Sequence, residues 1–271
     1  MNRNVRNILQ KEWRVIFQDP NNVLFVTLLP LLIVAEPLVV IWLVNHFGSA
    51  ALLGNSLIQS ALNQIEQEIP QLASSLSPDL PLRALLLSQF RFFILLIPTM
   101  IAVSFATFSI IEEKQSRSLE PLLATPVKTW EVLLGKALAG AIPAVLVSWV
   151  CGAVFFLGVA LMGWGDLISL VLSASWYLTF FLLTPAVAVL SFLLGVIGSS
   201  RARDAKNAQN MILLIVLPVL ILIGVQVIGL VWFTPLLTLF LSIGICLLDY
   251  LVLRLAVGLF QRESIVVKWN Y

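Results

Sequence analysis

Few residues of this 271-residue chain could carry enzymatic chemistry. Its single histidine, His46, lies at the end of an apolar run, and no plausible nucleophile stands near it. Nucleophilic catalysis needs such a pair, so the sequence argues against a hydrolase. Cys151 and Cys246 both fall inside apolar runs, where free cysteines are typically small packing residues. We therefore expect neither a disulfide nor a metal site.

A nucleotide site is also missing from the sequence. The P-loop pattern needs Ser or Thr after its Gly-Lys pair and a first Gly five residues before that pair. Here Ala137 follows Gly135-Lys136, and Trp130 stands at the place of the first Gly. We expect no cofactor in this chain, so any ATP chemistry must come from another polypeptide.

Glu36 is an acidic residue inside the apolar run 23–44, roughly 20 Å from its start at about 1.5 Å per residue. A charged carboxylate in a membrane costs roughly 3 kcal/mol, so it faces a cavity or a partner, or it stays protonated. A substrate or cation path is one hypothesis. The alternative is a structural hydrogen bond at the kink that Pro37 makes.

The stretch 112–136 contains eight of the chain's thirty charges and lies between very apolar segments. A charged, Pro-interrupted loop between two membrane spans is the arrangement expected of a protein that receives force from a soluble partner. The alternative is a solvated loop. Against it, Leu119, Leu122, Leu123 and Val127 offer more apolar surface than a free loop should expose.

The residues Glu113-Lys114, 118–126, Glu131 and Leu134-Gly135-Lys136 resemble the cytoplasmic loop of ABC-type-two permeases, the membrane subunits of one class of ATP-binding-cassette exporters. The family's usual sequence is Glu-Arg-Glu-x-Gly-Thr-Leu-Glu, whereas this chain has Lys114, Gln115 and Ser118 at the second, third and sixth places. In that family the loop forms a coupling helix in a groove of the ATPase. The resemblance implies that the coupling contacts come from Glu112, Glu113, Lys114, Arg117, Leu119, Glu120, Leu122, Leu123, Thr125 and Pro126. It also implies two cytoplasmic ATPase subunits, which bind ATP and Mg, and a second permease subunit, identical or related.

The composition indicates the fold class and the helices that position the candidate residues. Hydrophobic residues make up 60%, charged residues only 11%, and the mean hydropathy is +1.01, whereas a soluble domain is about a quarter charged. We expect an all-α polytopic membrane protein that is one permease domain with six spans. The predicted spans are 23–44, 83–111, 137–162, 167–197, 211–231 and 236–258, with an outer segment at 45–82 that contains an amphipathic helix, 49–69.

Residues 2–18 have apolar residues at helical spacing opposite Arg3, Arg6, Lys11 and Arg14. This pattern predicts an amphipathic helix on a membrane surface, with its basic face toward anionic headgroups. The alternative is a helix packed on its own protein, and both can hold together. Gly140, Ala144, Ser148 and Gly152 form a small-residue stripe that predicts close helix packing within the chain or, alternatively, a dimer seam.

Fourteen of the sixteen Lys and Arg residues lie on one side of the predicted spans. The positive-inside rule therefore places both termini and the loop 112–136 in the cytoplasm, in a plasma or bacterial inner membrane. The 199–210 loop, with Arg201, Arg203 and Lys206, is a second cytoplasmic contact or a lipid headgroup anchor. These basic residues are too few and too dispersed to bind nucleic acid.

We expect a permease subunit of an ATP-binding-cassette exporter. One alternative is a proton- or ion-coupled secondary transporter that uses Glu36, and another is a membrane scaffold without transport. An associated ATPase supports the first interpretation, whereas proton-driven uptake by this chain alone supports the second. The spans offer no selective chemistry beyond Glu36, so the sequence names no cargo.

Overall fold

The computed structural model describes residues 3–18, 20–47, 56–69, 79–115, 129–201, 205–227 and 233–259, and in these ranges it contains helices and no strand. The α-helices and short irregular helices (η) are α1 Arg3–Gln18, α2 Pro20–Phe47, α4 Ser56–Glu68, α6 Asp79–Gln89, η1 Phe90–Leu95, α7 Leu96–Gln115, α9 Thr129–Val159, η2 Ala160–Trp164, α10 Gly165–Val171, α11 Ala174–Leu178, η3 Thr179–Leu183, α12 Thr184–Arg201, α13 Ala205–Val227 and α14 Pro235–Leu259. The predicted all-α class is confirmed.

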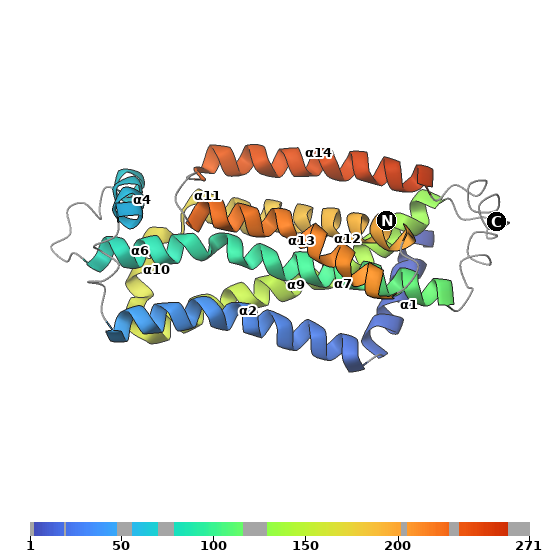
Figure 1. The fold of residues 1–271 in the computed structure, drawn as a ribbon, viewed down its shortest axis with the longest axis horizontal. Helices are drawn as coiled ribbons and strands as arrows, with labels where there is room; N and C mark the ends of the chain where they lie inside the picture. Colours follow the sequence, from blue (N-terminus) through green and yellow to red (C-terminus); the bar gives the residue numbers. More distant parts are fainter. Residues whose placement is uncertain are drawn as a thin grey trace.

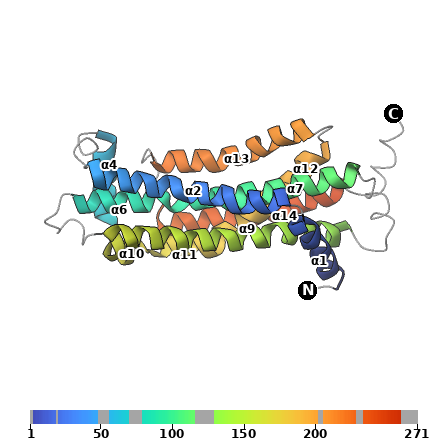
Figure 2. The ribbon, with the colours of Figure 1, turned by 90° about the horizontal axis from the view of Figure 1, so that it is seen from below.

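The long helices run side by side in alternating directions and form an elongated bundle (Figures 1 and 2). Helix α1 crosses one end of this bundle at a steep angle, and α4 and α10 lie at the opposite end (Figure 1). We call these the α1 end and the α4 end. Helix α7 ends and α9 begins at the α1 end, so the two helices that flank residues 116–128 meet α1 there.

Five segments of the described residues are long and apolar enough to cross a membrane, which confirms a multi-pass membrane protein. They are Val26–Val44, Leu80–Ile110, Thr129–Val171, Ala174–Ser200 and Pro235–Gly258. The predicted span 211–231 falls largely in α13, where the described apolar part, Ile212–Gln226, is shorter. A count of six spans therefore stays a prediction.

The connection between the third and fourth predicted spans differs from the sequence-based boundaries. The chain turns at Gly163, whose φ of 83° lies in the left-handed region that favours glycine. The short helix α10 follows, and a break at Leu172–Ser173 separates it from α11. The helix that returns along the bundle therefore begins at Ala174 rather than at residue 167. Helix α9, for its part, begins at Thr129, well before the predicted start at residue 137.

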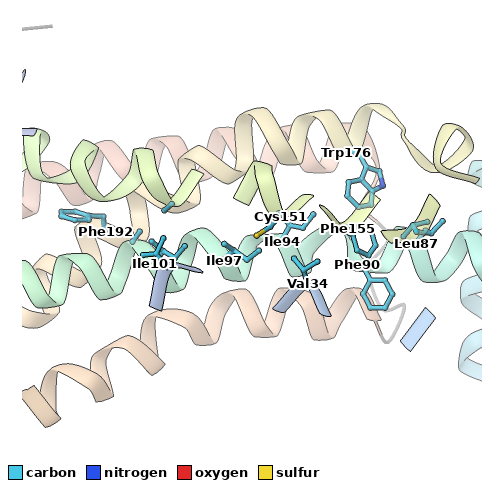
Figure 3. Packing of buried hydrophobic residues seen from close by; sticks show 14 of the residues in the cluster. Val34, Leu87, Phe90, Ile94, Ile97, Ile101, Cys151, Phe155, Trp176 and Phe192 are labelled. Atoms are coloured by element: carbon cyan, nitrogen blue, oxygen red, sulfur yellow. The ribbon is translucent and has the colours of Figure 1, made fainter. Parts of the chain in front are cut away.

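The segment that runs through η1 and α7 is the centre of the bundle. In its most apolar stretch 78% of residues are buried, against 11% for α14. Figure 3 shows buried side chains of the core following one another along the bundle. Those labelled are Phe192, Ile101, Ile97, Ile94, Cys151, Val34, Phe155, Phe90, Trp176 and Leu87. A central α7 is well placed to pass movement from one end of the bundle to the other.

The small-residue stripe of α9 packs inside this chain. A Cβ added at Gly140 would clash with the ring of Phe192 on α12, and one added at Gly152 would clash with the ring of Phe180 in η3. Ala144 and Ser148, between them, are also buried. The stripe therefore permits close packing of α9 against α12 and η3, as small residues do in membrane bundles.

Candidate functional site: the helix ends that flank residues 116–128

Most of the predicted coupling residues lie outside the described part of the chain. These are Arg117, Leu119, Glu120, Leu122, Leu123, Thr125 and Pro126. Glu112, Glu113 and Lys114 form the last turn of α7, where the backbone is described but their side chains are not. The structure describes the two helix ends that flank the loop, namely the end of α7 and the start of α9. We call these two helix ends the roots of the loop.

Helix α1 packs closely against α9, and it contacts α7 through the hydrogen bond between Ser109 and Glu12. Its buried face contains Val5, Leu9 and Ile16. On α9, a Cβ at Gly135 would lie 2.9 Å from Cγ2 of Ile8 and 3.3 Å from the carbonyl oxygen of Val5. Gly135 therefore lets the backbones of α1 and α9 approach each other. This close approach explains why a glycine suits this position of the Leu134-Gly135-Lys136 motif.

A buried polar cluster joins α1, α7 and α9. The Nζ of Lys136 lies 3.2 Å from Oε1 of Glu12, and it donates a hydrogen bond of 2.7 Å to Oγ of Ser109. Ser109 in turn donates to Oε2 of Glu12 at 3.0 Å. The side chains of Lys136 and Glu12 are only 3% and 9% exposed. Each of these three side chains therefore contacts the other two. We call Glu12, Ser109 and Lys136 together the root cluster.

Two further hydrogen bonds fix α1 along α9. Asn4 Nδ2 donates to Oε2 of Glu131 at 3.1 Å, near the first turn of α9. Trp13 Nε1 donates to the carbonyl oxygen of Ala139 at 2.9 Å, about two turns further along the same helix. With the root cluster between them, these bonds hold α1 over a length of α9 rather than at one point.

The root cluster is a mechanical link between α1, α7 and α9. Separating α1 from α9 would break the ion pair between Lys136 and Glu12 and the hydrogen bond from Ser109 to Glu12. The ends of α7 and α9 should therefore move together with α1 when a force acts on the loop. The arrangement can transmit displacement between the three helices.

The alternative prediction for residues 2–18, a helix packed on its own protein, agrees with these contacts. Arg6, Lys11 and Arg14 are exposed on the face of α1 opposite the buried residues. Contact of this basic face with lipid headgroups stays a prediction.

Sequence reasoning missed the partners in the root cluster, Glu12 and Ser109. A usable signal was present for Glu12, because Val5, Leu9, Glu12 and Ile16 share one helical face. An acid on an apolar face calls for a buried partner. Which residue would be that partner cannot be read locally, because Lys136 is far away in sequence.

Glu36 lies on the outward face of α2. Its side chain is exposed, as are those of Leu32 and Val39, whereas the adjacent Pro37 is buried. Among the described residues no hydrogen bond to Glu36 is present, so the structure gives no support to a bond at the Pro37 kink. A small hollow on the inner side of α2 is lined only by apolar residues: Ile33, Val34, Pro37, Phe90, Phe93, Ile94, Ile97 and Phe155.

The other predicted contact loop lies at the same end as the root cluster. Arg201 is the last residue of α12 and Lys206 lies in the first turn of α13, and both helix ends are at the α1 end (Figure 1). The side chains of these two residues are not described, and Arg203 lies outside the described residues. Their contact with a partner or with lipid stays a prediction.

Comparisons with known proteins bear on the whole chain. A search among curated proteins gave no match. A family model described as "ABC-2 family transporter protein" matches residues 6–262, nearly the full length. The match includes most of α1, the root cluster and the loop 116–128. Members of this family are membrane subunits of transporters whose ATPase activity lies in a partner. The chain belongs to the ABC-2 family of transporter proteins.

Proposed function

We propose that this chain is the permease subunit of an ATP-binding-cassette exporter and moves its cargo with ATP hydrolysed by a separate subunit. The family match over residues 6–262 supports the transporter class. The observation that carries the mechanism is the root cluster, which ties α1 to both helices flanking residues 116–128. If the two helix ends that flank the loop are linked, a force on the loop moves both helices together. If they were independent, the same force would only change the shape of the loop.

The complex that we propose has two cytoplasmic ATPase subunits, which bind ATP and Mg²⁺, and two permease subunits, identical or related. This chain itself holds no cofactor. The excess of Lys and Arg on one side supports a plasma or bacterial inner membrane location with both termini in the cytoplasm. The α1 end is then the cytoplasmic end, and anionic lipid contacts the exposed Arg6, Lys11 and Arg14.

The proposed cycle begins when the ATPase subunits close and pull on the segment 116–128. The end of α7 and the start of α9 follow as one unit with α1, because the root cluster joins them. The central position of α7 then carries the displacement toward the α4 end. Cargo passes between the two permeases as this movement widens and narrows the route.

Glu36 is our candidate for a residue on that route. Its exposed carboxylate lies on an apolar face of α2, and a carboxylate is unfavourable against lipid hydrocarbon. A second permease or a water-filled path would remove that cost. The same exposure keeps open the secondary transporter, in which Glu36 binds a proton or a cation. Transport that persists without an ATPase subunit would favour that second function.

The test of coupling is charge reversal at Glu113 and Glu120 in the reconstituted complex of permease and ATPase. We expect the double variant Glu113→Lys/Glu120→Lys to lose transport-stimulated ATP hydrolysis, because directional charge contacts with the ATPase are reversed. Asp166→Lys, an exposed reversal at the α4 end, is the matched control and should leave the stimulation intact. Stimulation that is unchanged in the double variant would discard the coupling role of this loop.

A further inference from the structure

Most buried hydroxyl groups of this bundle are satisfied by their own helix. Each donates to a carbonyl oxygen three to five residues earlier: Ser88 to Leu85, Thr99 to Leu95, Ser148 to Ala144, Thr179 to Ser175, Thr184 to Thr179, Ser199 to Gly195 and Ser242 to Thr238. This is the usual solution for a polar group within a membrane helix. It makes exceptions among the buried polar residues informative.

Two glutamines are exceptions. Gln89 and Gln226 are 6% and 1% exposed, and both atoms of each amide have no hydrogen-bond partner among the described residues. Each amide can donate two hydrogen bonds and accept two. Burial of such a group without partners is costly, and more so where lipid surrounds the helices. Water or a polar ligand between the helices would remove that cost.

The two glutamines lie in the same layer of the bundle. Phe92 of η1 and Ile223 of α13 belong to one apolar cluster, and α13 packs against both η1 and α6. Gln89 precedes Phe92 by three residues and Gln226 follows Ile223 by three, and their helices run in opposite directions. Gln89 is therefore one turn nearer the α4 end than Phe92, and Gln226 is one turn nearer that end than Ile223.

A buried positive charge lies in the same region. Arg91 is 4% exposed, its Nη2 donates to the carbonyl oxygen of Phe233 at 2.9 Å, and its guanidinium lies 4.9 Å from the ring centre of Phe92. Ser175 donates to the same carbonyl oxygen at 3.4 Å. The neighbouring Trp176 is 1% exposed, and its Nε1 has no hydrogen-bond partner among the described residues. Residues from η1 and α11 thus converge on Phe233.

We propose that Gln89, Arg91 and Gln226 line a hydrated site near the α4 end that binds an anionic group, a carboxylate or a phosphate. The guanidinium supplies the charge, and the amides supply neutral donors in apolar surroundings that strengthen both kinds of contact. The anion is either a soluble one or the headgroup of an acidic lipid. This site is far from the root cluster, and its existence does not depend on the proposed ATPase coupling.

The test uses Gln226→Cys in the full-length chain with Cys151→Ala and Cys246→Ser, held in phosphatidylcholine nanodiscs. The anionic reagent sulfonatoethyl methanethiosulfonate and the cationic trimethylammonium analogue are compared, each rate divided by the rate with a free thiol. We expect the anionic reagent to be favoured about tenfold, because the Arg91 charge attracts it. Ile223→Cys, one turn deeper in the apolar cluster, is the control and should stay unreactive.

Arg91 variants then test the source of the preference. Arg91→Gln should abolish the preference for the anionic reagent, whereas Arg91→Lys should keep it and shows that a variant at this position folds. No reaction at position 226 with either reagent would mean a dry layer and would overturn the site. A preference that survives in Arg91→Gln would overturn the role of the charge.

Protection distinguishes the two sources of the anion. Slower labelling at position 226 in the presence of inorganic phosphate supports a soluble anion. Slower labelling only in nanodiscs that contain phosphatidylglycerol supports a lipid headgroup. Labelling that neither phosphate nor phosphatidylglycerol slows would contradict anion binding.

Discussion

Replacing Lys136 by methionine would remove the charge that joins α1 to the roots of the loop 116–128. Methionine keeps much of the side-chain volume, so the loss is chiefly electrostatic. Among the described residues, the carboxylate of Glu12 then keeps only the hydrogen bond from Ser109 and stays buried without its ion pair. We expect α1 to open away from α9, because an open helix returns that carboxylate to water.

The size of the effect follows from the burial of the pair. Lys136 and Glu12 are 3% and 9% exposed and 3.2 Å apart, and removing one partner of such a pair costs about 3–5 kcal/mol. The double variant Glu12→Gln/Lys136→Met leaves no buried charge, and Ser109 can still donate to the new amide. Neutral replacement of a buried pair is often close to neutral in stability. The two changes should therefore be far from additive, with an interaction energy of at least about 2 kcal/mol.

Tryptic cleavage of α1 measures this opening directly, because Arg6, Lys11 and Arg14 are exposed but lie in a packed helix. When opening is fast, the cleavage rate follows the population of the open form. A cost of about 3 kcal/mol corresponds to roughly a hundredfold faster cleavage for Lys136→Met, and the double variant should return to within about tenfold of the wild type. Cleavage after Arg262, in the segment that follows α14, serves as the internal reference.

Two results would refute this reasoning. Equal cleavage of α1 in the wild type and in Lys136→Met would mean that the ion pair does not hold the helix. Cleavage in the double variant at or above the rates of the single variants Lys136→Met and Glu12→Gln would mean that the two side chains do not interact.

Further predictions concern three other positions. Gly135→Ala should loosen α1 by about 1–3 kcal/mol, seen as faster tryptic cleavage, because the new Cβ would lie 2.9 Å from Ile8. Gly224→Ala, with nothing within 4 Å, is its control and should leave that cleavage unchanged. Gly140→Ala should lower the melting temperature, and adding Phe192→Leu should recover part of the loss, since that ring occupies the place of the new Cβ. Glu36→Gln should reduce transport or change its pH dependence, and intact transport with an unchanged pH profile would remove Glu36 from the cargo route.

Much of the fold could be predicted from hydropathy. Each apolar run must form a helix in lipid, because no other backbone partner is available there. The turn at Gly163 was also accessible, since glycine in a short polar stretch is a common chain reversal. The separate helix α10 could not be predicted, because the helix is interrupted at Leu172 and Ser173, where the sequence has neither a proline nor a glycine. Its packing against α6 is a tertiary effect that the local sequence does not contain.

The candidate site was predictable only in part. A family resemblance identified the loop and its flanking Gly135-Lys136, but not the role of those two residues. That role depends on α1, whose Glu12 is more than a hundred residues from Lys136 in sequence. Local patterns can indicate that Glu12 needs a buried partner, and only the packing of α1 against α7 and α9 supplies its identity.

The central claim is that the segment between α7 and α9 receives force from an ATPase. The most direct measurement places a photo-crosslinking amino acid at Leu122, irradiates native membranes and identifies the adduct by mass spectrometry. The account predicts an adduct with a protein that contains a P-loop, lost when the crosslinker stands instead at the exposed Asp166. Adducts at position 122 with lipid or with this chain alone would contradict it.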